Sequence, residues 1–142
     1  MGRNIKAVSN NTTNPTRVNE ASTNNVINVE EKLSLFFDYW SPKVIAMMND
    51  YQFKLVKMKG AFTWHSHDET DEVFIVIKGE MSIALRDTQI SLAAGEMYVV
   101  PKGVEHKPYS ASECHLLLVE PSGVVNTGEA GGELTAEMDV WI

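Results

Sequence analysis

Cysteine is nearly absent from this chain, because its 142 residues contain only Cys114. A single cysteine excludes an intramolecular disulfide and the thiolate-rich clusters of structural zinc sites. No sequence pattern pairs Cys114 with a base, so we expect an inert, partly buried thiol. Long hydrophobic runs and an apolar N-terminal signal segment are also missing, so we expect neither membrane spanning nor secretion. A cytoplasmic location fits these absences.

Basic residues are scarce outside the N-terminal region, and the formal net charge of the chain is −7. Residues 1–28 hold eight asparagines and three basic residues against one acid, which is typical of a low-complexity, flexible tail. A partner that orders this tail as an arm is an alternative, as is a transit peptide without the usual Arg-rich face. Because the tail contributes +2, residues 29–142 carry −9, a charge that repels nucleic acid and anionic membranes. We expect neither as a partner.

Aromatic residues make up only 8% of the chain, but several follow the tail directly. Asn28 and Glu31 match a capping box, which predicts a helix over 29–40 that Ser41-Pro42 ends. Four apolar residues of this helix recur at helical spacing: Leu33, Phe36, Phe37 and Trp40. Plain packing is the favoured role of this stripe, and a lid over a ligand site or a dimer contact are the alternatives. We expect the protein to be a homodimer.

The rest of the chain reads as β-structure. Val44 to Met48 and Gln52 to Lys59 flank an Asn49-Asp50 turn, and the apolar runs 73–77 and 81–85 indicate two strands joined by a tight turn at Lys78-Gly79-Glu80. Residues 97–100 lead through a Pro101-Lys102-Gly103 turn to a return strand. Residues 121–142 are looser, and 137–142 either pair as a terminal strand or dock an aromatic side chain. No internal repeat is evident, so 29–142 is expected to be one domain.

The chain has four histidines, and two of them form the tripeptide His65-Ser66-His67. Alternate residues of a strand share a face, so both imidazoles can point into one cavity. A helical chelate would need spacing of three or four residues instead. Glu72 is placed at a strand entrance with six residues between it and Gly79, and Asp71 is its alternative. His106, after the Pro-x-Gly turn, supplies a third imidazole.

These residues resemble the two motifs of the cupin superfamily. Gly60, His65, His67, Glu72 and Gly79 follow the first motif, although four residues rather than five separate Gly60 from His65. Four residues match the main positions of the second motif, namely Gly95, Pro101, Gly103 and His106. Ser110 stands where this motif usually ends in Asn. The resemblance covers residues 44–120 and implies a single antiparallel jelly-roll barrel, with the metal inside and a ligand entering at its mouth.

Three neutral imidazoles and a carboxylate make a donor set that suits Fe, Mn, Ni, Co, Cu or Zn as a divalent ion. His65, His67, Glu72 and His106 are therefore the predicted metal ligands, and a metal-free descendant of the fold is the alternative. Four protein ligands on an octahedral ion leave about two positions open for water, dioxygen or substrate. The fourth histidine, His115, is expected to be structural, with a place in the cavity as the alternative.

Three functions remain open on the sequence alone. The first is a metal-dependent enzyme acting on a small oxygen-rich metabolite, which the resemblance extends to a dioxygenase or a sugar isomerase-like enzyme. Tyr98 and Tyr109 are candidate proton donors in it, and Phe74 and Val76 share the parity of Glu72 and are candidates to line its pocket. The second is a non-catalytic sugar- or small-ligand-binding module or sensor. The third is a structural dimer with a vestigial site.

Overall fold

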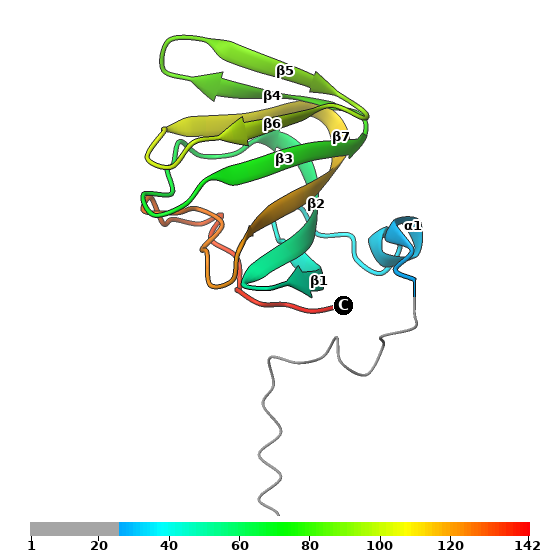
Figure 1. The fold of residues 1–142 in the computed structure, drawn as a ribbon. Coiled ribbons are helices and arrows are strands. Elements are labelled where there is room, and N and C mark those ends of the chain that lie inside the picture. Colours follow the sequence, from blue (N-terminus) through cyan, green and yellow to red (C-terminus); the bar gives the residue numbers. More distant parts are fainter. Residues whose placement is uncertain (1–25) are drawn as a thin grey trace, which may run out of the picture.

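The computed structural model describes residues 26–142, whose regular structure is almost entirely antiparallel β-sheet (Figure 1). Most of the predicted tail, residues 1–25, lies outside the described residues. The described elements are α1 (Val29–Leu33), β1 (Lys43–Met48), β2 (Tyr51–Ala61), β3 (Glu72–Lys78), β4 (Glu80–Leu85), β5 (Gln89–Ala93), β6 (Met97–Val100) and β7 (His106–Pro121). The expected all-β fold with one short helix is confirmed, although the sheet is curled rather than closed into a complete hydrogen-bonded barrel.

Strand β7 organises the sheet because it pairs with three other strands. Residues 109–121 of β7 pair with β2, and the other edge of β7 pairs with β4 at 106–109 and with β3 at 115–119. The strand order is β1-β2-β7-β3-β6, with β5 paired to β4. Figure 1 shows the resulting curl, in which β2 and β7 pass behind β3 and β6. The inner face carries the main apolar core, which includes Met58, Val76, Ile83 and Leu116.

The predicted tight turn at Lys78-Gly79-Glu80 is wrong. Both β3 and β4 run antiparallel to β7, with Val73 opposite Val119 and Leu85 opposite His106, so they continue in one direction as a single bent strand. Gly79 lies at the bend with φ +85°, where a Cβ atom would come within 2.9 Å of the Glu113 carbonyl oxygen. The Lys-Gly-Glu sequence has the composition of a turn, but pairing of both β3 and β4 with the long strand β7 keeps the chain running in one direction.

The predicted helix over 29–40 is also too long, since α1 ends at Leu33. Its N-cap is as expected, because the Asn28 side chain accepts a hydrogen bond from the Glu31 backbone at 3.1 Å. Beyond α1, Phe36 packs into a second core with Leu33, whereas Trp40 packs against the core on the inner face of the sheet. One helical face cannot reach two separate cores, so the chain leaves the helix and Trp40 adopts a left-handed backbone with φ 59°.

The C-terminal segment crosses back over the sheet after β7. Between Ser122 and Val140 it forms turns, and its end lies beside β1 through a single parallel bridge between Val44 and Trp141. The backbone of Val44 accepts from Ile142 and donates to Val140, so the end of the segment pairs with β1 at one bridge without forming a terminal strand. Nothing helical within 26–142 has the length and apolar character that crossing a membrane requires.

Candidate metal centre

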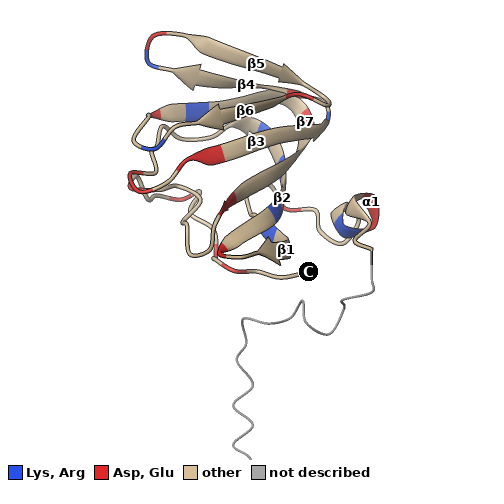
Figure 2. Ribbon diagram, viewed as in Figure 1, with Lys and Arg blue, Asp and Glu red and all other residues tan. Residues whose placement is uncertain are grey.

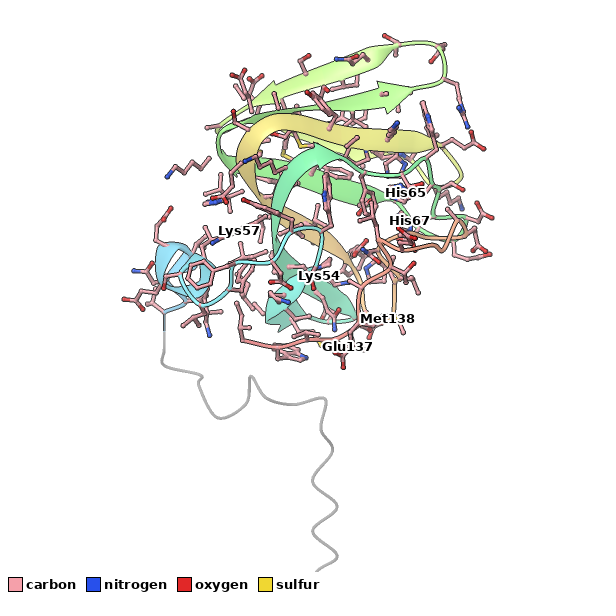
Figure 3. The ribbon with its side chains drawn as sticks, turned by 180° about the vertical axis from the view of Figure 1, so that it is seen from behind. Lys54, Lys57, His65, His67, Glu137 and Met138 are labelled. Carbon is pink, nitrogen blue, oxygen red and sulfur yellow. The ribbon has the colours of Figure 1, made fainter. Side chains whose placement is uncertain are left out.

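The fold brings four predicted metal ligands into one buried cluster. His65 and His67 lie in the connection between β2 and β3, Glu72 begins β3, and His106 begins β7. Each of the four residues is no more than 6% exposed, and one potential ligand atom from each lies within 4.8 Å of the others. Figure 3 shows His65 and His67 next to one another at the end of the sheet.

Backbone pairing holds the cluster together. His65 and His106 exchange two backbone hydrogen bonds, of 3.0 and 2.9 Å, and so form an isolated antiparallel bridge between segments far apart in sequence. The carbonyl of His67 accepts from Gly103 at 2.9 Å, which ties the HxH segment to the turn before β7. Glu72 is paired with Val100 at the start of the β3–β6 ladder. Each ligand is therefore fixed by main-chain contacts and not by its side chain alone.

Carbonyl oxygens set the orientation of two imidazole rings. His65 Nδ1 lies 3.0 Å from the Thr63 carbonyl and His106 Nδ1 lies 2.9 Å from the Val104 carbonyl. Since a carbonyl only accepts, each Nδ1 carries the hydrogen and the lone pair of the neutral ring is on Nε2. Metal-ligating histidines commonly donate their second N–H to a backbone carbonyl in this way.

The nitrogen lone pairs face a carboxylate, which is unfavourable without a cation. His106 Nε2 lies 3.1 Å from Glu72 Oε2, so two acceptors oppose one another when the ring is neutral. His67 Nε2 lies 3.2 Å from the same oxygen, is buried, and has no aligned hydrogen-bond partner among the described residues. A proton or a metal ion between these atoms removes the conflict. The residues present therefore fit a divalent metal with nitrogen and oxygen ligands.

The charges of the metal-free cluster follow from burial and from this crowding. Burial, together with the nearby His106 ring, lowers the pKa of His65 to about 4. Burial acts to raise the pKa of Glu72, but the His106 and His67 nitrogens beside it lower that pKa to about 2. For His67, burial acts to lower the pKa, and the adjacent Glu72 charge outweighs it and raises the pKa. A carboxylate ionised at neutral pH lies among imidazoles in a site largely closed to water.

The alternatives considered for this site lie elsewhere. Asp71 belongs to the acidic loop before β3 (Figure 2), where its carboxylate accepts from the Lys102 backbone at 2.8 Å. His115 pairs with Glu113 at 2.8 Å, away from the cluster. Burial raises the pKa of the Cys114 thiol to about 11, so this residue stays protonated, as an inert core thiol would.

A small cavity of about 30 Å³ adjoins the cluster on the side of His65 and Glu72, with space for roughly two water molecules. Its wall is mainly apolar and aromatic. Trp40 stacks on Phe62 with ring centroids 4.7 Å apart, and Phe62 meets His65 edge to face. The polar lining residues are His65, Glu72, Glu120 and Asn126. Such a wall excludes bulk water and strengthens the electrostatic interactions inside.

Of the residues predicted from strand parity, Phe74 lines this cavity and its ring meets His106 edge to face. Val76 is buried in the core beyond it. Tyr98 packs against the core, and Tyr109 is 46% exposed beside a separate groove near β4 and β5, so neither candidate proton donor borders the cavity.

Sequence reasoning missed a buried ion pair at the cavity, formed by Lys54 and Glu120. The signal was present in strand parity. Glu120 follows Leu116 and Leu118 at alternate positions of one apolar run, and Lys54 precedes Val56 in the same way. A charged residue at a core position of a predicted strand marks a candidate site, because burying a charge without a partner is costly.

Comparisons with known proteins agree with this architecture. The cupin domain family model matches residues 53–120. A solved cupin-2 domain protein from Shewanella frigidimarina NCIMB 400 is 62% identical with a TM-score of 0.67, and the match covers 68% of this chain and 94% of that chain. Protein NMB1881 of Neisseria meningitidis is 36% identical with a TM-score of 0.64, over 69% and 100% of the two chains.

A curated relative extends the comparison to Bacillus subtilis strain 168. Its uncharacterized protein YdbB is 35% identical over 77 residues, which are 54% of this chain and 68% of the relative. The family-model match over residues 53–120 includes both histidine motifs. A curled antiparallel sheet, a buried three-histidine, one-glutamate cluster and close relatives of the same architecture lead to one conclusion: this chain is a small protein of the cupin superfamily.

Proposed function

We propose that this protein is a metal-dependent enzyme that acts on a small oxygen-rich metabolite. One divalent transition metal ion is held by His65, His67, Glu72 and His106. The observation that carries the proposal is the convergence of nitrogen lone pairs on the Glu72 carboxylate, with His106 Nε2 at 3.1 Å and the otherwise unpartnered His67 Nε2 at 3.2 Å. Groups that repel one another in this way are accounted for by a shared cation.

Different residues of the chain have different roles around such an ion. The Thr63 and Val104 carbonyls keep the lone pairs of His65 and His106 directed inward. Trp40, Phe62 and Phe74 exclude water from the ligand side. A bound ion supplies Lewis acidity to an oxygen of the substrate, or a binding position for dioxygen. The reaction is either dioxygenase chemistry or isomerase chemistry of the sugar isomerase type.

Metal analysis of protein purified without added metal tests the proposal first. We expect close to one equivalent of a transition metal, or its recovery on adding Fe(II) or Mn(II) after chelation. Oxygen uptake with Fe(II)-loaded protein and a panel of diketones and phenols then tests oxidation, and incubation with uronates and aldoses tests isomerisation. Protein that takes up no metal would contradict the proposal and support a vestigial site.

A non-catalytic ligand-binding module or sensor is the second candidate. The small volume of the cavity, and the position of Tyr98 and Tyr109 away from it, favour this function. This second function would be supported if the protein held stoichiometric metal and bound a ligand tightly but turned over no compound of the substrate panel.

A further inference from the structure

A buried ion pair adjoins the metal centre without belonging to the predicted ligand set. Lys54 on β2 is 4% exposed and Glu120 on β7 is 1% exposed. Lys54 Nζ donates to Glu120 Oε1 at 2.8 Å. Transfer of both charges from water is costly, and apolar residues of similar volume are often as stable or more stable at such positions. Fold stability alone therefore gives little reason for this pair.

Glu120 lines the cavity, and one oxygen of its carboxylate is buried without a hydrogen-bond partner among the described residues. Leu116, Leu118 and Glu120 are alternate residues of β7, and all three line the cavity together with His65 and Glu72. Lys54 takes Oε1, whereas Oε2 is buried and has no hydrogen-bond partner in the described part of the chain. An ionised carboxylate oxygen without a donor is an acceptor ready for a ligand.

The cavity suits a small ligand group. A volume of about 30 Å³ has room for a head group with two polar atoms. One of these atoms faces the side lined by His65 and Glu72, and the other faces Glu120. A donor is required at the second position, because Glu120 Oε2 offers only lone pairs. The matching class is a pair of adjacent oxygens of which one is a hydroxyl, as in an α-hydroxy carbonyl, an enediol or a hydroxamic acid.

We propose that Glu120 is a catalytic residue that takes the hydroxyl proton of such a head group on Oε2, and that Lys54 is the positioning residue for this carboxylate. This inference rests on the proposed function. In the step, the O–H bond of the ligand breaks, a new O–H bond forms on Glu120, and the electron pair stays on the ligand oxygen. The ligand becomes an anion beside the metal centre, and no oxidant or reductant is consumed.

Burial of Glu120 suits this step. In the metal-free protein, burial and the charge of Glu72 raise the pKa of Glu120 to about 7, and the opposing charges of Lys54 and His67 limit the rise. A cation bound to Glu72 would compensate the charge of Glu72 and leave burial as the main cause of the raised pKa. A proton acceptor with a pKa near the operating pH both takes and returns a proton efficiently. Glu72 is unsuited to this task, because its oxygen already faces the imidazoles.

Acetohydroxamic acid is the test probe, with cobalt(II)-loaded full-length protein, whose visible spectrum reports ligand binding. Calorimetry in buffers of different ionisation enthalpy, at about pH 8, counts the protons released on binding. We expect the wild type to release almost none, because the negative charge left on the bound ligand raises the pKa of Glu120 above the pH of the buffer, so that Glu120 keeps the proton. Glu120→Gln should release close to one proton per ligand and bind about tenfold more weakly or worse. N-methoxyacetamide, which lacks the hydroxyl, should bind both proteins equally weakly.

Glu113→Gln is the matched control, because it removes an exposed carboxylate from the same strand and should behave as the wild type. Release of one proton by the wild type, or equal proton counts for wild type and Glu120→Gln, would overturn the inference while leaving the metal site intact. Failure of the wild type to bind cobalt would instead overturn the proposed function and the inference with it. The wild-type proton count stands as a test even where Glu120→Gln does not fold.

Discussion

At the scale of single residues, the candidate site depends on opposed lone pairs that are each fixed by a backbone contact. Substituting His67 tests this arrangement most directly, since its Nε2 is buried without an aligned partner. We expect His67→Ala to lose stoichiometric metal while keeping a β-sheet circular dichroism spectrum. Equilibrium dialysis with Zn(II) or Co(II) measures the loss, and full metal content in a folded variant would contradict the ligand assignment.

His65 gives the metal-free protein a specific pH dependence. Its pKa is about 4 when folded, below the ordinary value of 6.5, because burial and His106 disfavour its charged form. Below about 6.5 the unfolded chain therefore binds the proton more readily, and the free energy of unfolding should fall by roughly 3 kcal/mol as the pH drops to about 4. Part of this slope should disappear in His65→Asn.

Urea denaturation of chelated protein at a series of pH values measures this effect. The raised pKa of His67 acts in the opposite direction, since its contribution is present at low pH and is lost as pH rises. The lowered pKa of Glu72 adds a further loss of stability below about pH 4.5. A stability profile for His65→Asn parallel to that of the wild type would show that His65 does not cause the slope.

Residue patterns predicted much of the site but not all of it. The spacing of His65, His67, Glu72 and His106 was legible because a motif fixes their places relative to turns. Glu120 and Lys54 belong to no motif, and their meeting depends on the β2–β7 register, in which Lys54 lies opposite Leu118. Register over such a sequence separation is set by the whole sheet, so the pair became visible only in the fold.

At the scale of secondary-structure elements, the bend between β3 and β4 depends on Gly79. A Cβ atom there would meet the Glu113 carbonyl at 2.9 Å, in addition to the strain of φ +85°. We expect Gly79→Ala to lower the free energy of unfolding by roughly 2 kcal/mol or more. Gly95→Ala is the control, because Gly95 has the same φ and open space around it. Urea denaturation should show a clearly larger loss for Gly79→Ala than for the control.

The same elements show why local patterns predicted some connections and missed others. The Asn49-Asp50 turn was predicted because β1 and β2 are neighbours in sequence and in the sheet. The bend at Gly79 was predicted as a chain reversal, because a glycine between two apolar runs gives the same sequence pattern in a bend and in a reversal. Only the length of β7, which pairs with both runs, distinguishes them.

At the scale of the whole molecule, the C-terminal segment lies against the candidate site. A Cβ atom at Gly128 would overlap the Ser66 carbonyl and come within 3.2 Å of His67 Nδ1. We expect Gly128→Ala to displace this contact and to weaken metal affinity about tenfold, because 1.4 kcal/mol of distortion corresponds to that factor. Gly131→Ala, at a similar φ with open space, should bind metal as the wild type does. Competition dialysis compares the two, and equal affinities would contradict the coupling.

The homodimer expected from the sequence stays a prediction. Leu35 and Phe37, in the segment after α1, are 62% and 82% exposed and are available for a contact between copies. Sedimentation velocity of the wild type and of Phe37→Ser would test it, with a shift toward monomer expected for the variant. A wild type that sediments as a monomer over a range of concentrations would contradict it.

The long strand β7 joins the two functional ends of the protein, with His106 at its start and Glu120 near its end. Met58 lies opposite Cys114 and Gly60 lies opposite Ser110, so β7 has two more residues than β2 between these pairs. Because the excess is an even number, the side chains of His106 and Glu120 stay on the same face of the sheet. Adding or removing one residue in the strand would turn one of the two side chains outward. We therefore expect relatives that keep both groups to keep an even spacing between them in sequence.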